Sequence, residues 1–121
     1  MNLNDYQELA ERTANYGPEW NAEKRFINFS FGLMGELGEV IDLLKKHLFH
    51  KHELDREKLK YELGDLLWYV ATTASTAGIM LDDIAESNIA KLKARYPDGF
   101  SEECSINRKP FVPSKFDDSH Y

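Results

Sequence analysis

A four-residue pattern occurs twice in this chain, each time inside a long helical repeat, and it limits strongly how the chain can fold. Residues Glu36–Glu39 and Glu62–Asp65 both read acid-Leu-Gly-acid. Residues three apart are neighbours on one face of a helix, so each copy presents two acids together. The sequence therefore predicts two helices that each carry a pair of carboxylates.

The two helical repeats can be bounded from the sequence. Apolar residues recur at three- and four-residue spacing over about 22–48, and residues 50–54 form a short connection. Asp55 is a suitable N-cap for the next helix, which extends to about Ala77, where Gly78 can end it. The apolar stripe expected on the first of these helices consists of Phe26, Leu33, Leu37, Val40, Ile41, Leu44 and Leu48.

A short connection makes the two helices antiparallel neighbours, and this sets which residues lie at equal height. The pair Glu36 and Asp65 and the pair Glu39 and Glu62 share one midpoint, between His50 and Lys51. That midpoint falls at the short connection, which the composition of the chain indicates independently. We therefore expect four acids at one level of one helix hairpin.

Two further helices complete the pattern. The first runs to about Tyr16, with Asn2 or Asn4 as its cap, and Gly17 and Pro18 end it. Another spans about 81–95 and is stopped by Pro97. The last 25 residues read as an ordered turn followed by an extended chain, and no important strand is expected.

These elements predict an all-α fold, a bundle of four to five helices built around an antiparallel metal-binding hairpin. Residues 1–109 are expected to form a single domain, and 110–121 an extended or mobile tail. The stretch from Leu66 to Leu81 carries no charge, which is more apolar surface than a small monomer covers easily. Self-association, most simply as a twofold dimer, follows as a hypothesis.

The four acids predict a cation site. Phe29 and Leu43 lie on nearly the same helix face as Glu36, which draws this carboxylate toward the interior. Two like charges 4 Å apart cost about 4 kcal/mol at an effective dielectric near 20, so four acids need a cation or must stay partly protonated. Oxygen ligands select hard ions such as Mg²⁺. Gly38 and Gly64 cost roughly 1 kcal/mol each within a helix, which close helix approach or room for a ligand would explain.

Composition excludes other classes of function. A net charge of -6 and a pI near 5.2 leave no electrostatic footprint for a nucleic-acid polymer. The single cysteine, Cys104, forms neither an intramolecular disulfide nor a metal cluster, which favours a reducing, cytoplasmic setting. The N-terminal segment is polar and acidic, unlike a signal peptide, and the uncharged stretch is too short for a membrane span.

Of two alternatives to this metal site, the residues alone leave one open and exclude the other. A lone Glu-x-x-Glu is usually a solvated helix face, so the chain could be a non-catalytic helical interaction protein. Calorimetry with Mg²⁺ and a non-hydrolysable nucleotide separates this alternative from an enzyme. A di-iron bundle needs Glu-x-x-His, and no histidine here has a glutamate three positions before it.

The ordered set of motifs resembles the MazG-like all-α nucleotide pyrophosphohydrolases over about residues 3–109. The set comprises the two acid pairs, then Asn88-x-x-Lys91-Leu92, then Arg95-Tyr96-Pro97. The resemblance implies a helical fold that forms a homodimer or homotetramer. It also implies that Mg²⁺, with Mn²⁺ as a substitute, assists release of pyrophosphate from a nucleoside triphosphate. Deoxycytidine triphosphatase-like relatives and short phage proteins are the most similar types.

The resemblance also assigns roles to individual residues. Glu36, Glu39, Glu62 and Asp65 match the metal ligands, and Glu36 and Glu39 are the catalytic candidates, with Glu36 preferred as general base. Many relatives have a glutamate where this chain has Gly35, so the number of metal ions stays open. Ordinary core packing is the alternative for the aromatic members of the substrate-binding set. That set comprises Asn88, Lys91 and Arg95 for sugar and phosphate, Trp20 and Tyr69 for base or sugar, and Asn28 in the same pocket.

Overall fold

The structure is a computed structural model that describes residues 1–14 and 16–112, and these residues form helices and no strand. Within them, no helix combines the length and the apolar character that a membrane span requires. The all-α prediction is confirmed. The predicted tail, 110–121, lies mostly outside the described residues. The helices are α1 (Leu3–Glu11), α2 (Ala22–Phe49), α3 (Arg56–Thr76), α4 (Leu81–Arg95) and α5 (Glu102–Ile106).

The chain divides into two compact units, Met1–Asp82 and Asp83–Tyr121. The first unit holds α1, α2 and α3, while the second holds most of α4 and all of α5. The proposed single domain ending at residue 109 stays a prediction.

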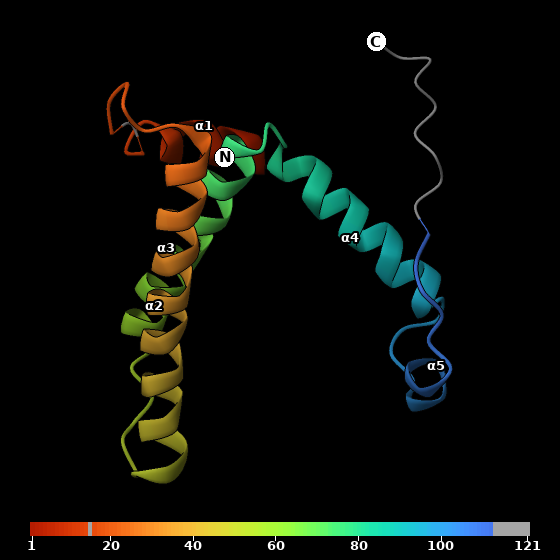
Figure 1. The fold of residues 1–121 in the computed structure, drawn as a ribbon. Coiled ribbons are helices and arrows are strands. Elements are labelled where there is room, and N and C mark those ends of the chain that lie inside the picture. Colours follow the sequence, from red (N-terminus) through yellow and green to blue (C-terminus); the bar gives the residue numbers. More distant parts are fainter. Residues whose placement is uncertain (15, 113–121) are drawn as a thin grey trace. The chain divides into compact units, whose positions relative to one another are not determined.

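Helices α2 and α3 lie side by side and run antiparallel, as the hairpin prediction requires (Figure 1). The Arg25 side chain on α2 donates a hydrogen bond from Nε to the Thr76 Oγ1 on α3 at 3.0 Å. Gly32 on α2 lies directly against the ring of Tyr69 on α3. Both pairs share the midpoint predicted from the sequence, so the predicted register of the hairpin is confirmed.

The helix ends follow the local chemistry closely in α2, α3 and α4. The Asp55 carboxylate caps α3 by accepting a hydrogen bond from the backbone N–H of Lys58 at 2.9 Å. Gly78, just beyond the end of α3, has a φ of 71°, a left-handed conformation that glycine adopts without strain. The predicted limits of α4 are confirmed, and α2 extends one residue past its predicted end.

The end predicted for α1 is wrong, because this helix stops at Glu11 rather than near Tyr16. Asn2, not Asn4, is its cap. After Glu11 the chain forms hydrogen bonds with side chains of α2 and α3. The Thr13 hydroxyl accepts a hydrogen bond from Trp68 Nε1 at 2.7 Å, and the Ala14 carbonyl accepts one from Arg25 Nη1 at 3.3 Å.

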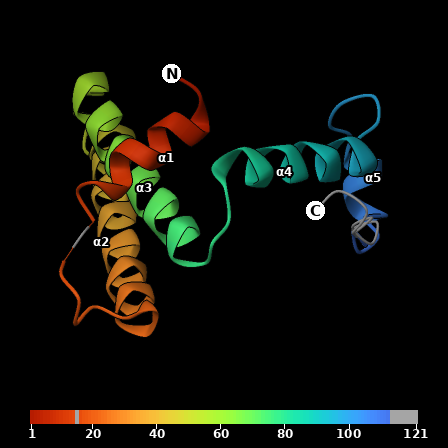
Figure 2. The ribbon, with the colours of Figure 1, turned by 90° about the horizontal axis from the view of Figure 1, so that it is seen from above.

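Helix α1 lies against α3 (Figure 2). A buried glutamine that the sequence did not single out, Gln7, joins the two helices. The Gln7 side-chain amide donates to Ser75 Oγ at 3.1 Å and to the Ile79 carbonyl at 2.8 Å. Its oxygen accepts from the backbone N–H of Leu81 at 2.8 Å. Each polar atom of this buried side chain therefore has a hydrogen-bond partner, as burial requires. The hydrophobic core beside it comprises Ala10, Ala71, Ala74 and Leu81, with Tyr6 and Trp68 packed against it.

The buried face of α2 differs from the predicted stripe. Phe29 is fully buried and Val40 is buried, whereas Leu37, Ile41 and Leu48 of the stripe are exposed. Helix α2 is apolar on more than one face, and periodicity alone cannot say which face meets α3. The prediction that Glu36 and Phe29 share one helix face agrees with the structure.

The sequence reading of the last 25 residues missed α5. Ser101 caps this short helix, since its hydroxyl accepts a hydrogen bond from the backbone N–H of Cys104 at 3.0 Å. The turn predicted at Asp98-Gly99 is present, and Gly99 has a φ of 90°.

Candidate metal centre

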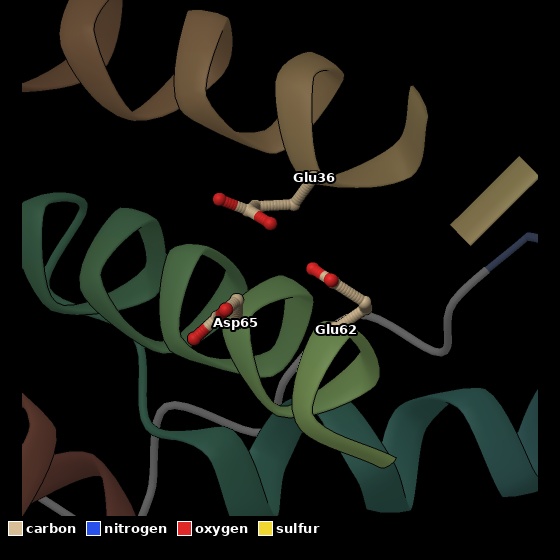
Figure 3. A group of neighbouring side chains, drawn as sticks. All are labelled: Glu36, Glu62 and Asp65. Atoms are coloured by element: carbon tan, nitrogen blue, oxygen red, sulfur yellow. The ribbon is translucent and has the colours of Figure 1, made fainter. Parts of the chain in front are cut away.

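Three of the four predicted acids come together on the facing sides of α2 and α3. One carboxylate oxygen from each of Glu36, Glu62 and Asp65 lies within 4.8 Å of the others. Glu36 projects from α2 toward Glu62 on α3, with Asp65 one turn along the same helix (Figure 3). Glu36 and Glu62 are half-buried, and Asp65 is exposed.

The three carboxylates of this group carry like charges, which repel one another. The pKa of Glu36 is raised above its usual value, first by burial and then by the negative charges of Asp65 and Glu62. A hydrogen bond with the Glu62 side chain raises the pKa further, because it favours the protonated form of Glu36. A divalent cation would remove this conflict, and oxygen-only ligands match hard ions such as Mg²⁺. The donor set therefore fits the metal that the sequence predicted.

Glu39 lies outside the group of three. It is exposed, and its charge is the smallest of the causes that raise the pKa of Glu36. Glu39 is thus near enough to influence Glu36 but does not share the 4.8 Å cluster. Its role as a fourth ligand stays a prediction.

The glycines of the two acidic motifs are not explained by close helix approach. A Cβ atom added at Gly38 or Gly64 would meet nothing within 4 Å among the described residues. Of the two predicted explanations for these glycines, room for a ligand remains. Close approach by a second copy of the chain is a further explanation. Gly32, which sequence analysis did not single out, is instead the glycine in tight contact.

An aromatic cluster adjoins the carboxylates. The Tyr69 ring contacts Trp68 edge-on, with centroids 4.9 Å apart, and lies 6.4 Å from Phe29. On the other side, Tyr16 stacks on Trp20 at 4.7 Å and lies 6.2 Å from Phe29. The two predicted aromatic residues, Trp20 and Tyr69, thus belong to one cluster. Tyr16 was missed as a member because it was assigned to the end of the first helix.

The remaining predicted residues are not tied to the acidic group by any described contact. Asn28 is exposed on α2, beside the buried Phe29. Asn88, Lys91 and Arg95 lie on α4 in the second unit. Their position at the acidic group therefore stays a prediction.

Arg95 has a distinct setting inside the second unit. Its Nε is buried without a hydrogen-bond partner among the described residues. Together with Arg108 and Lys109, it lines a cavity of about 510 Å³.

The fold and the site define a class before any comparison: an all-helical protein whose paired helices present a carboxylate centre suited to a divalent cation. The chain belongs to the MazG nucleotide pyrophosphohydrolase domain family, whose sequence profile matches residues 28–100. The resemblance drawn from the motifs is thereby confirmed.

A viral protein provides a relative along nearly the whole chain. The Gene 37 protein of Mycobacterium phage L5 is 32% identical over 114 residues, which cover 89% of this chain and 100% of the phage protein. No solved structure matches the chain significantly. The family supports a nucleotide pyrophosphohydrolase that uses a divalent metal.

Proposed function

We propose that this chain is a Mg²⁺-dependent hydrolase that converts nucleoside or deoxynucleoside triphosphates to monophosphate and pyrophosphate. The observation that carries the proposal is the convergence of Glu36, Glu62 and Asp65 in a chain of the MazG family. Nucleotide-pool control or house-cleaning in a reducing cytoplasm is the biological role that fits this reaction.

The carboxylates would hold the ion. Glu36, Glu62 and Asp65 supply three oxygen ligands, and Glu39 is the candidate for a fourth. When bound, the ion supplies charge neutralisation for the triphosphate and Lewis acidity toward water.

The reaction itself is a hydrolysis at the α-phosphorus. A water oxygen forms a bond to this phosphorus, and the bond from phosphorus to the bridging oxygen of the β-phosphate breaks, so pyrophosphate leaves. A carboxylate accepts the proton that the water loses. Glu36 is the candidate for this role, because its half-buried carboxylate projects from α2 into the centre.

Six further residues are proposed for substrate recognition. Trp20 and Tyr69 would enclose the base or sugar, with Asn28 in the same pocket. Asn88, Lys91 and Arg95 would contact sugar and phosphate, for which the planar guanidinium of Arg95 is well suited. The cluster of Tyr16, Trp20, Phe29 and Tyr69 supports the aromatic part of this assignment.

A panel of standard, deoxy and damaged triphosphates tests the proposed function. Each is incubated with the protein and Mg²⁺, and the products are separated into pyrophosphate and orthophosphate. We expect monophosphate and pyrophosphate in equal amounts, no turnover with a chelator, and recovery with Mn²⁺. Release of orthophosphate alone would refute the cleavage position, and no turnover of any triphosphate would refute the proposed function.

We also propose that the chain works as a homodimer or homotetramer joined through an exposed stripe on α2. Phe31 and Met34 are each 70% exposed, and Ile27 and Ile41 are at least half exposed. Their spacing places them on one face, opposite the face of Glu36. Gly38 falls on the same stripe, where its missing side chain would let a second copy approach. So much exposed apolar surface supports an interface.

Adding charge to this stripe should dissociate the assembly. Phe31→Glu combined with Met34→Glu is expected to convert the oligomer to a monomer in sedimentation equilibrium, because an interface would bury two unpaired carboxylates. Ile106→Glu places one such charge on an apolar residue that is 82% exposed in the second unit, and this control should leave the mass unchanged. A monomeric wild-type protein at high concentration would rule out the interface.

A further inference from the structure

One tight contact between α2 and α3 near the acidic group involves a glycine. Gly32 lies one turn before Glu36, and Tyr69 lies one turn after Asp65, so both sit about 5–6 Å along the hairpin from the carboxylates. A Cβ atom at position 32 would overlap Cε1 and Cζ of the Tyr69 ring. By contrast, a Cβ at Gly35 would meet nothing within 4 Å. Position 32 therefore has no space for a methyl group.

Two other rings lie beside the half-buried Tyr69 ring. Trp68 meets it edge-on, with an interplanar angle of 89°. The fully buried Phe29 lies on α2 three residues before Gly32. These neighbours leave the ring a recess whose wall on the α2 side is the bare backbone of Gly32.

The hydroxyl oxygen of Tyr69 lies against α2 at Gly32, since a Cβ atom there would also overlap this oxygen. Burial, and then the charges of Glu36, the neighbouring Tyr16 and Asp65, raise the pKa of this phenol, so it stays protonated and can donate a hydrogen bond. Among the described residues, no hydrogen bond joins this hydroxyl to another group. A neutral donor that feels the charges of Glu36 and Asp65 is suited to a phosphate oxygen held there, because hydrogen bonds to charged acceptors are the strong ones.

We infer that Gly32 is a positioning residue, whose missing side chain places the Tyr69 hydroxyl to donate a hydrogen bond to an oxygen of the triphosphate. This inference rests on the proposed function. For Tyr69, it replaces the contact with base or sugar proposed above by a contact with phosphate.

The first test removes only the hydroxyl. Tyr69→Phe is expected to lower kcat/KM for triphosphate hydrolysis by about tenfold to a hundredfold, the loss typical of one hydrogen bond to a charged group. The thermal midpoint and the affinity for Mn²⁺ alone should stay at wild-type values, because the ring and the carboxylates are intact. Base preference across the substrate panel should also stay unchanged. A change in base preference without a common loss would instead assign Tyr69 to the base.

The second test couples the two residues. Gly32→Ala is expected to lower the thermal midpoint by about 5–15 °C and kcat/KM at least as much as Tyr69→Phe, since the ring must move. Tyr69→Leu removes the overlapping atoms, so adding Gly32→Ala to it should cause no further loss of either quantity. Gly35→Ala is the matched control and should leave activity unchanged while preserving or raising the midpoint.

The outcomes separate the two proposals. Additive losses from Gly32→Ala and Tyr69→Leu would overturn the positioning role, and this is visible in thermal midpoints even without activity. An active wild-type enzyme with a fully active Tyr69→Phe variant would overturn the role of the hydroxyl alone. A wild-type protein without turnover would overturn the proposed function and the role of the hydroxyl together.

Discussion

Replacing Asp65 with asparagine is expected to lower triphosphate hydrolysis about a thousandfold, the effect of losing several kcal/mol of charge stabilisation at the metal. Asp65 is the exposed member of the cluster with Glu36 and Glu62, so the substitution removes a ligand without opening a cavity. Binding of Mn²⁺, followed by calorimetry, should weaken in parallel. Glu39→Gln should also reduce activity if Glu39 is a fourth ligand.

The same substitution should stabilise the protein when no metal is present, which distinguishes a ligand from a structural residue. The folded state raises the pKa of Glu36, partly through Asp65. A carboxyl group whose pKa is raised in the folded state stabilises that state at pH values below its ordinary pKa. This stability is lost as the pH rises through the raised pKa. With a chelator present, urea unfolding should therefore show a free energy of unfolding that falls as the pH rises from the ordinary to the raised pKa of Glu36. The fall should be smaller in Asp65→Asn. An unchanged pH profile together with full activity would contradict the metal centre.

A matched substitution controls for charge on α3. Glu57→Gln alters an exposed glutamate of the same helix, 2.7 Å from Lys60 and outside the cluster. Its effects on activity and on metal affinity should be negligible. A loss similar to that of Asp65→Asn would mean that the overall charge of the helix, not a bound ion, controls the reaction.

The largest effect on stability is expected for Arg25→Ala, a loss of about 2–4 kcal/mol in the free energy of unfolding. The Arg25 guanidinium is paired with Glu11, donates to Thr76 and to the Ala14 carbonyl, and lies 5.2 Å from the centroid of Phe29. Its side chain is only 17% exposed. Its removal leaves Glu11 unpaired, and one oxygen of that carboxylate is already buried without a partner among the described residues.

Urea or thermal unfolding measures this loss, and an exposed ion pair provides the comparison. Lys60→Ala breaks the pair with Glu57, whose side chains are 66% and 73% exposed, and should change stability by less than about 0.5 kcal/mol. Equal effects of Arg25→Ala and Lys60→Ala would show that Arg25 does not join the end of α1 to the hairpin.

Local rules were sufficient to predict the hairpin and most of its acidic centre. Caps and breakers such as Asp55 and Gly78 act within a few residues, so the limits of α3 follow from the sequence. A short connection makes two long helices antiparallel, and equal distances from the turn then bring Glu36 level with Asp65. Periodicity and chain connectivity therefore account for three of the four acids.

Only the tertiary structure decided the features that depend on which surfaces meet. Helix α1 ends at Glu11, and the residues that follow it bond to Trp68 and Arg25, which are distant in sequence. Glu39 stands apart from the three clustered acids because equal height along a helix does not fix the direction around its axis. Gly32 matters because a ring from another helix occupies the space beside it. Each of these is a packing relation between distant segments, which sequence periodicity does not encode.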